Sequence, residues 1–350
     1  MIISFNPAIF QNQNLEIQSD LAKILVKLTE NNHFIDATSI SKIFFDDKNE
    51  YIFYKNDIYE NCLSKLDRKS LKEYFEKKIL EPIPVLYRTY LTRITIGTDA
   101  GEIHPRNAYK ILTERSTIIV ENGINDRKFI EGISQKYSSS KKRRSIYVLI
   151  SNAIKREIIE FDNAGGSGEI QKRIQHWMNA PRYFNIYKYK LMALFDSDKN
   201  SDDDFNARKY KKLIEFLKNR EISNPPSEND IIYEDHDLII WHILYKKELE
   251  NYIPLDILFD KFPEITATQK NDLKNTNTDD LDFIEYNYNN IGIGEKTIKT
   301  EFPEMFLGNF SYRLLEQRCE HHKVKIELPD GKIEEISELE QILLKIAKII

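Results

Sequence analysis

The residues best suited to chemistry lie in the segment KLMALFDSDK, residues 190–199. An apolar run from Leu191 to Phe195 ends abruptly in Asp196-Ser197-Asp198, which predicts a buried strand of a parallel sheet. Functional sites of open α/β sheets lie beyond the carboxyl ends of the strands, where these carboxylates would stand. Two aspartates this close repel each other unless a cation separates them, and Mg²⁺ is the usual cation. A solvated acidic turn is the alternative interpretation.

Three more carboxylates stand next to predicted strands, namely Glu121, Asp126 and Glu250. The carboxyl ends of neighbouring parallel strands lie side by side, so we expect these acids to converge with Asp196 and Asp198. A hard cation prefers several oxygen ligands, and two such cations can bind the attacking and leaving oxygens of a phosphodiester. The pattern therefore predicts a metal site for phosphodiester chemistry.

The elements that must position these acids alternate between strand and helix over residues 111–254, which predicts an α/β unit with a mostly parallel sheet flanked by helices. The predicted strands cover residues 116–120, 158–161, 191–195 and 238–244. Helices are predicted after the first strand, where Asn125 is a candidate cap, and at Phe205–Leu217. A glycine-rich turn around Gly165-Gly166 follows the second strand, where the backbone can approach a metal or a phosphate closely, although a plain tight turn explains it equally well.

Mixed α+β extensions flank this unit, an N-terminal one over residues 1–110 and a C-terminal one over residues 255–350. In the N-terminal extension, Ser19 is a candidate helix cap. Residues 51–54 and 86–96 are rich in strand-forming side chains.

In the C-terminal extension, Lys325–Glu335 predicts a hairpin around Pro329-Asp330-Gly331. Ser337 and Glu340 have the spacing of a capping box for a final helix.

The ordered acids resemble the motifs of the topoisomerase–primase (Toprim) fold, and most closely those of the Toprim nucleases of the OLD (overcoming lysogenization defect) type. The segment IIVENGINDRKFI is similar to the first motif, LFDSDK to the second, and LYKKELENYIP to the terminal Glu-Asn-Tyr element of that group. The resemblance covers residues 111–254. The spacing from Glu121 to Asp126 is one residue longer than in many relatives.

The resemblance implies a Mg²⁺- or Mn²⁺-dependent endonuclease, an effector of bacterial anti-phage defence. The implied metal ligands are Glu121, Asp126, Asp196, Asp198 and Glu250. The implied catalytic residues are Glu121, Asp196, Asp198 and Lys247, with Lys247 or its neighbour Lys246 stabilising charge on the phosphorus. No Gly-x-x-x-x-Gly-Lys-Ser/Thr loop occurs, so an ATPase or sensor would be a separate partner.

The expected macromolecular substrate is DNA or RNA, although the net charge of −5 provides no global basic field. The segments 138–144 (SSSKKRR) and 182–190 (RYFNIYKYK) supply local positive charge, the second with interleaved aromatics. Two distant cysteines, Cys62 and Cys319, indicate a reducing cytoplasm. No signal peptide and no apolar run of spanning length are evident, so we expect no membrane association. The sequence is also compatible with a homo-oligomer.

Two other functions compete with the nuclease. In a haloacid-dehalogenase-like phosphatase, Asp196 would be the nucleophile and Asp198 the acid. That family places its Asp-x-Asp after the first strand of its domain, whereas strands precede it here. In a degenerate Toprim protein, the chain would serve only as a binding or scaffolding subunit. The retained acids argue against this alternative.

Overall fold

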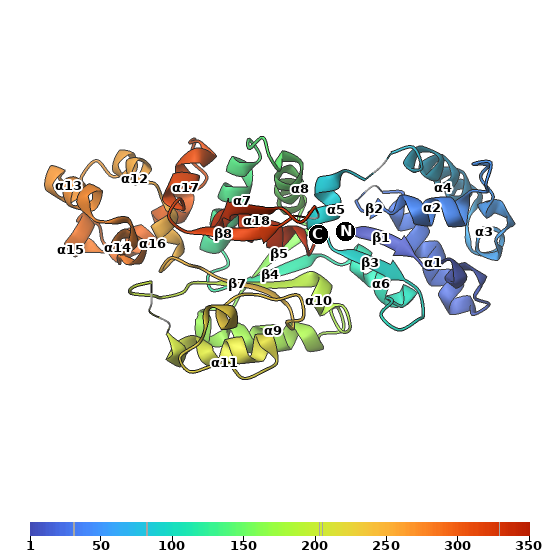
Figure 1. Ribbon diagram of the computed structural model, residues 1–350, viewed down its shortest axis with the longest axis horizontal. Coiled ribbons are helices and arrows are strands. Elements are labelled where there is room, and N and C mark those ends of the chain that lie inside the picture. The colour runs from blue at the N-terminus through green and yellow to red at the C-terminus, as the bar shows by residue number, and fades with distance from the viewer. Residues whose placement is uncertain (31, 82, 203, 205, 329) are drawn as a thin grey trace. The chain divides into compact units, whose positions relative to one another are not determined.

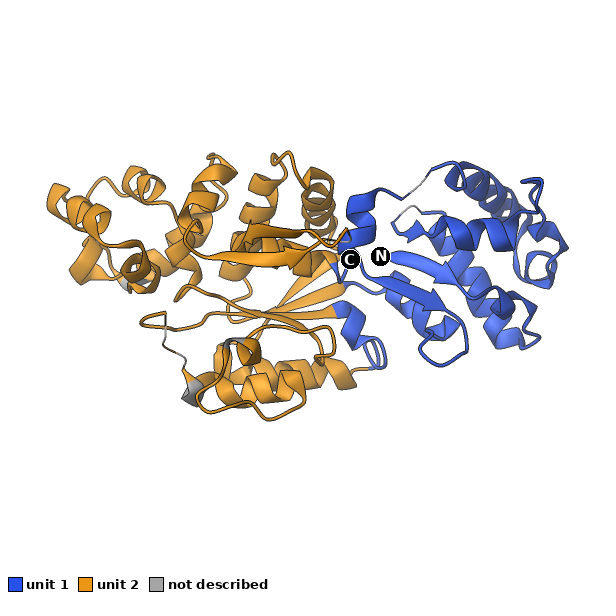
Figure 2. Ribbon diagram, in the orientation of Figure 1, with its two compact units in different colours: residues 1–115, 181–190, 348–350 blue, residues 116–180, 191–347 orange. Residues whose placement is uncertain are grey.

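The computed structural model describes residues 1–350 except 31, 82, 203, 205 and 329. The chain forms two compact units, shown in Figure 2. Unit 1 comprises residues 1–115, 181–190 and 348–350, and unit 2 comprises residues 116–180 and 191–347. The division into residues 1–110, 111–254 and 255–350 stays a prediction.

Unit 1 is built on a small parallel sheet with the strand order β2-β1-β3 (Figure 1). The strands are β1 (Ile2–Phe5), β2 (Phe34–Ile35) and β3 (Arg93–Ile96). The helices are η1 (Pro7–Gln11), α1 (Leu15–Leu28), α2 (Ala37–Phe44), η2 (Phe53–Lys55), α3 (Asp57–Cys62), α4 (Lys65–Lys78), α5 (Val85–Tyr90), α6 (Pro105–Thr113) and α10 (Tyr187–Lys190). Both chain ends join this unit, because the N-terminal amine donates to the carbonyl of Ile350 at 2.6 Å.

Two local predictions for unit 1 are wrong, and a third is confirmed only in part. Helix α1 begins at Leu15 and is capped by Asn14, whose side chain accepts from two backbone amides, so Ser19 lies inside the helix. Residues 51–54 contain an isolated bridge and part of a 3₁₀ turn instead of a strand. Residues 86–96 divide between helix α5 and strand β3. In each case the local composition also suits the competing structure, and tertiary packing decides.

Unit 2 contains the predicted parallel sheet, with the strand order β5-β4-β6-β7. The strands are β4 (Ser116–Val120), β5 (Ile159–Asn163), β6 (Leu191–Phe195) and β7 (Ile240–Ile243). Strands β4 and β6 are buried along their whole length, as expected for the centre of a sheet covered on both faces. Val120 pairs with Leu194, so the residues that follow β4 and β6 emerge at the same edge.

Helices cover both faces of this sheet, as Figure 1 shows. Helices α7 (Asn125–Tyr137), α8 (Arg144–Lys155) and α18 (Glu338–Ala347) pack together on one face. Helices α9 (Ile170–Asn179) and α11 (Ala207–Lys218) lie on the other. The α/β class predicted for this region is therefore confirmed. The predicted start of helix α11, Phe205, lies outside the described residues. Helix α7 begins at Asn125, but the side chain of Asn122 accepts from the amide of Asn125, so Asn125 is not the cap.

The remaining elements of unit 2 are short helices and a hairpin. They are η3 (Ser167–Glu169), η4 (Glu228–Ile231), η5 (Leu249–Tyr252), α12 (Leu255–Lys261), α13 (Ala267–Asn275), α14 (Thr278–Phe283), α15 (Tyr288–Ile291), α16 (Glu295–Met305), α17 (Tyr312–Arg318), β8 (Lys323–Glu327) and β9 (Ile333–Ser337). Strands β8 and β9 are antiparallel, which confirms the hairpin, although Pro329 in its predicted turn lies outside the described residues. Only half of the predicted capping box forms. Ser337 accepts from the amide of Glu340 at 3.2 Å, whereas the Glu340 carboxylate pairs with Arg143 at 3.1 Å.

Gly132 of α7 allows close contact with the C-terminal helices, because a Cβ built there would lie 2.5 Å from both the Cβ and the backbone oxygen of Phe306. We expect Gly132→Ala to lower the free energy of unfolding. Overpacking costs about 1–3 kcal/mol and exceeds the roughly 1 kcal/mol gained in helix propensity. Denaturant unfolding measures the effect. Gly168→Ala is the control, since no atom lies within 4 Å of its Cβ. An unchanged midpoint for Gly132→Ala would contradict this contact.

Candidate active site

Glu121 and Asp196 meet at the carboxyl edge of the parallel sheet. Glu121 follows β4 and Asp196 follows β6, which pair directly. The backbone amide of Asp196 donates to Glu121 Oε1 at 3.2 Å. The sheet register therefore brings together two acids that are far apart in the sequence, as expected from the strand pattern.

Asp126 and Glu250 join this pair. Both are 8% exposed, Asp126 in the first turn of α7 and Glu250 in the 3₁₀ turn η5 after β7. Asp126 Oδ2 accepts from the amide of Asn122 at 2.9 Å, which fixes the carboxylate over the turn that follows β4. The charges of Glu121, Asp126 and Glu250 all act on Asp196. Four of the five predicted metal ligands therefore share one electrostatic environment.

A further acid, Glu248, was not predicted from the sequence. It precedes η5, is partly buried, and its charge acts on Asp196, Glu121 and Glu250. The available signal was the spacing of two residues between Glu248 and Glu250, which matches that of the Asp196–Asp198 pair. We call Glu121, Asp126, Asp196, Glu248 and Glu250 the carboxylate cluster.

Burial is the main reason why every acid of the carboxylate cluster has a raised pKa. It raises the pKa of Asp126 to about 7 and that of Glu250 to about 8. It raises the pKa of Asp196 well above its usual range, and the neighbouring acids add to that increase. The pKa values of Glu121 and Glu248 are also raised by burial. The negative charge that builds up here at neutral pH is unfavourable unless a cation compensates it.

Asp198, the fifth predicted metal ligand, is held by helix α11. Its backbone is left-handed, with φ +51°, which Asp tolerates better than most residues. Its Oδ2 accepts from Tyr210 OH at 2.6 Å and pairs with the ammonium of Lys209. The carboxylate of Asp198 is therefore compensated by a lysine in this structure.

The predicted catalytic lysine, Lys247, donates to Asn200 Oδ1 at 2.9 Å, and its charge lowers the pKa of Glu248. Its neighbour Lys246 is 1% exposed and forms an ion pair with Asp282. The ammonium of Lys246 is therefore held inside the core by Asp282. Lys247 lies beside the carboxylate cluster.

The glycine-rich turn after β5 borders the cluster, because the backbone amide of Ser167 donates to Glu121. Gly165 and Gly166 have φ values of +78° and +125°, which side-chain-bearing residues rarely adopt. No atom lies within 4 Å of a Cβ built at either glycine. The turn therefore presents open backbone next to Glu121.

The basic segments offer less positive charge than their sequences suggest. Arg143 is 3% exposed and pairs with Glu334 and Glu340, and Lys142 pairs with Glu334. In unit 1, Arg182 pairs with Glu114 at 2.9 Å. These side chains have structural partners, so a role in phosphate binding would require breaking ion pairs.

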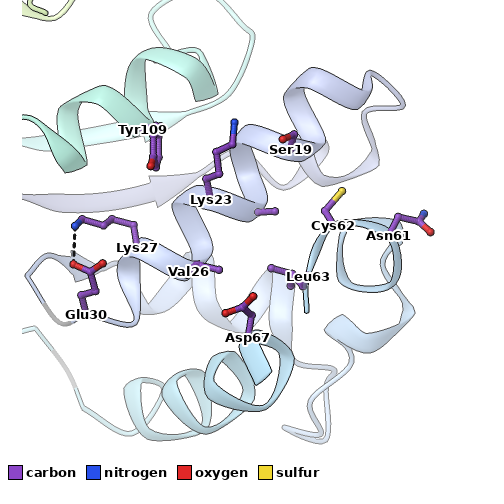
Figure 3. Close-up of a pocket in the computed structure, with 11 residues that line it drawn as sticks. Ser19, Lys23, Val26, Lys27, Glu30, Asn61, Cys62, Leu63, Asp67 and Tyr109 are labelled. Carbon is purple, nitrogen blue, oxygen red and sulfur yellow. Dashed lines mark hydrogen bonds and ion pairs between the residues drawn. The ribbon is translucent and has the colours of Figure 1, made fainter. Parts of the chain in front are cut away.

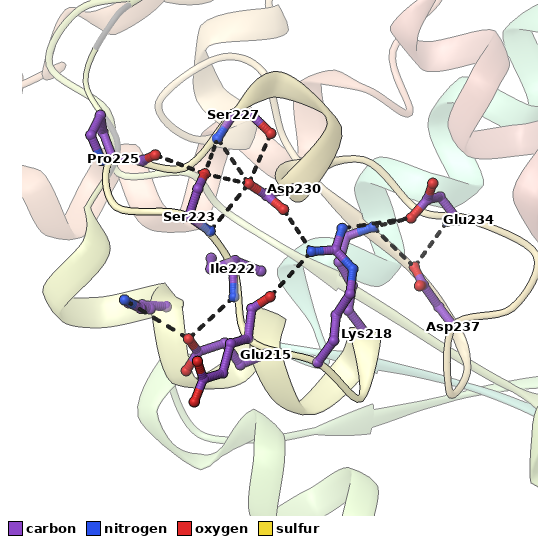
Figure 4. Close-up of polar contacts among 12 residues, drawn as sticks. Glu215, Lys218, Ile222, Ser223, Pro225, Ser227, Asp230, Glu234 and Asp237 are labelled. Atoms are coloured by element: carbon purple, nitrogen blue, oxygen red, sulfur yellow. Dashed lines mark hydrogen bonds and ion pairs between the residues drawn. The ribbon is translucent and has the colours of Figure 1, made fainter.

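A second acidic group lies away from the carboxylate cluster. Among the residues that the structure describes, only Glu234, His236 and Asp237 bring three metal-ligating atoms within 4.8 Å of one another. Figure 4 shows Lys218 pointing between two of these acids, with its ammonium 2.8 Å from Glu234 Oε2 and 3.8 Å from Asp237 Oδ2. This lysine already compensates the charge, so we assign no metal there. The acids of the carboxylate cluster are farther apart and would have to move inward to share one cation.

A hollow of about 520 Å³ lies on unit 1, between α1, α6 and the residues around α3 (Figure 3). Lys23, Lys27 and Tyr109 line it, and Lys27 pairs there with Glu30 at 2.6 Å. Its charges are mixed and already paired in part, so it is a weaker candidate than the carboxylate cluster.

Two buried carboxylates of the C-terminal region hold the segment that bears Glu248 and Glu250. Asp282 is fully buried and pairs with Lys246 and Arg318, and Arg318 also donates to the carbonyl of Asn251 at 2.6 Å. Glu338 accepts from the hydroxyl of Tyr252. We call Asp282 and Glu338 the two anchors.

His242 also contacts the second anchor. Its Nε2 donates to Glu338 at 2.8 Å, while its Nδ1 accepts from Lys345 at 2.9 Å. Burial, followed by the charge of Lys345, lowers the pKa of His242 to about 4. The imidazole is therefore neutral at pH 7 and serves as a polar link between β7 and α18.

Comparison with protein-family models, with curated proteins and with solved structures finds no match to this chain. Within the described part of the chain, no helix has both the length and the apolar character needed to cross a membrane.

Removal of the first anchor should destabilise the protein strongly. Asp282→Ala leaves Lys246 and Arg318 buried without their carboxylate, and breaking a buried pair in this way costs about 3–5 kcal/mol. Urea unfolding measures the loss. Asp279→Ala, an exposed acid of the same helix, is the control and should change stability by less than about 0.5 kcal/mol. Equal effects of the two substitutions would contradict the anchoring role.

The stability of the metal-free protein should depend on Glu250 in a pH-dependent manner. The folded-state pKa of about 8 lies above the ordinary value of 4.5, so the folded protein holds an extra proton between these two pH values. Stability is therefore highest below pH 4.5 and falls as the pH rises to about 8. Glu250→Gln removes this dependence. Relative to wild type, the variant should gain roughly 3–4 kcal/mol between pH 5 and pH 8, at about 1.4 kcal/mol for each pH unit. Unfolding in the presence of a chelator measures this, with the exposed Glu320→Gln as control. A constant difference between variant and wild type would contradict the raised pKa.

Proposed function

We propose that this protein is a divalent-metal-dependent nuclease of the Toprim type, related to the OLD nucleases. The carboxylate cluster supports this proposal most directly. Its acids approach one another at the carboxyl edge of a parallel sheet, where burial and mutual repulsion favour a compensating cation. The order of the acids along the chain matches the motifs that suggested the family.

The donor set fits a hard cation, since it offers only carboxylate oxygens. Glu121, Asp126, Asp196, Glu248 and Glu250 would hold Mg²⁺ or Mn²⁺, with Asp198 available after release from its present partners. A bound divalent cation supplies charge stabilisation at a phosphodiester and lowers the pKa of bound water. The two anchors hold the Glu248–Glu250 segment in register with the sheet edge.

Glu121 is the best candidate for proton transfer from the attacking water. It is only partly buried, its pKa is raised, and it stands beside the open glycine-rich turn. A base whose pKa approaches the working pH is the most effective. Lys247, beside Glu248, remains the proposed cation toward the phosphate.

The proposed biological setting is anti-phage defence in the cytoplasm, in combination with a separate ATPase or sensor, and rests on family analogy. DNA and RNA are both candidate substrates.

The central test is Glu121→Gln, which keeps the side-chain shape and removes the charge. We expect cleavage of DNA or RNA with Mg²⁺ or Mn²⁺ to fall by about 100-fold or more, while thermal unfolding shows a folded protein. Glu320→Gln is the control and should cleave at the wild-type rate, since Glu320 is exposed and lies outside the cluster.

Two results would contradict the proposal. One is wild-type cleavage by Glu121→Gln. The other is labelled phosphate trapped on Asp196 from a small phosphomonoester, with turnover unaffected by Glu121→Gln, which would establish the phosphatase mechanism instead.

A further inference from the structure

Helix α11 provides two donors to the carboxylate of Asp198. The ammonium of Lys209 pairs with Oδ2, and Tyr210 OH donates to the same oxygen at 2.6 Å. The Asp198 backbone is fixed as well, because its amide donates to the carbonyl of Lys247 at 3.0 Å. The carboxylate is therefore directed toward α11 by side-chain contacts and by the left-handed turn.

The charge of Lys209 extends beyond Asp198 to the carboxylate cluster. It is the strongest of the influences that lower the pKa of Glu121, and it also lowers that of Glu248. Tyr210, in contrast, is fully buried and stacks on Phe195 with ring centroids 5.4 Å apart. The helix is thus anchored at Tyr210, while the neighbouring ammonium lies among three acids.

Two other lysines near the cluster have partners of their own. The ammonium of Lys246 pairs with Asp282 inside the core, and that of Lys247 donates to Asn200. The side chain of Lys209 is 29% exposed and that of Asp198 is 27% exposed, so water reaches their ion pair. A partly exposed pair of this kind contributes little to stability and is easily exchanged.

We propose that Lys209 is a built-in counter-cation of this site, which holds Asp198 in the metal-free protein and releases it when a divalent cation binds. The inference rests on the proposed metal-dependent function. It adds that Lys209 competes with the metal ion for the ligand Asp198. The flexible four-carbon stem of lysine lets the ammonium withdraw without movement of the helix. Once released, Asp198 is free to complete the ligand set beside Asp196.

If Lys209 competes with the metal ion for Asp198, its removal should increase metal affinity. Most substitutions at a metal site lower that affinity. Lys209→Met removes the competing ammonium, so Mn²⁺ should bind about fivefold more tightly than to wild type. Lys209→Arg retains the positive charge and should bind Mn²⁺ as wild type does. Lys212→Met, an exposed lysine on the same helix, is the matched control for lost surface charge and should also resemble wild type.

The experiment measures Mn²⁺ binding by calorimetry and by electron paramagnetic resonance on the full chain, without nucleic acid. The shift in unfolding temperature with Mn²⁺ is a second readout, and it should be larger for Lys209→Met than for wild type. If Lys209→Met does not fold, Lys209→Gln replaces it, since its polar end keeps a hydrogen bond to Asp198 within reach.

The outcomes separate this inference from the proposed function. Unchanged or weaker Mn²⁺ binding by Lys209→Met, or by Lys209→Gln where it replaces that variant, with normal binding by wild type, overturns the counter-cation and leaves the metal-dependent nuclease standing. Equal tightening in Lys212→Met also overturns it, because the effect would then be general charge. Absence of Mn²⁺ binding from both wild type and Lys209→Met overturns the metal site, and with it both proposals.

Discussion

Electrostatic repulsion among buried and partly buried acids is the constraint that the rest of unit 2 has to balance. Glu121 and Asp196 are forced together by the pairing of β4 with β6, and the chain then adds Asp126, Glu248 and Glu250 to the same edge. Such an arrangement is unfavourable in isolation, because burial and like charges both oppose ionisation. It persists because the surrounding structure over-determines the positions of the backbone segments that bear the acids.

The C-terminal region fixes one of the backbone segments that bear these acids. Residues 255–347 belong to the same compact unit as the sheet, and the two anchors, Asp282 and Glu338, come from this region. They fix the segment after β7 through Arg318, which donates to the carbonyl of Asn251, and through the hydroxyl of Tyr252. The helices after residue 254 are therefore part of the support of the candidate site.

Much of the fold and part of the site could be predicted from sequence. Strands β4 and β6 are short apolar runs with abrupt acidic ends, and this pattern fixes both their burial and the edge at which Glu121 and Asp196 emerge. The direction of the Asp198 carboxylate could not be predicted, because it depends on Lys209 and Tyr210 of a helix whose placement is a tertiary result.

Other features were hidden for the same reason. No local pattern distinguishes Glu248 from an ordinary surface acid, because it is the anchors that place its segment beside Asp196. The charge of Arg143 appeared free in the sequence, but the hairpin and α18 bring Glu334 and Glu340 to it. Local patterns report the element to which a residue belongs, whereas its ionic partners are set by long-range contacts. The measurement that tests the central claim most directly is the anomalous diffraction of crystals grown with Mn²⁺. We predict an ion bound by Glu121 and Asp196 at the sheet edge. An ion found only at Glu234 and Asp237, or none at saturating Mn²⁺, would contradict it.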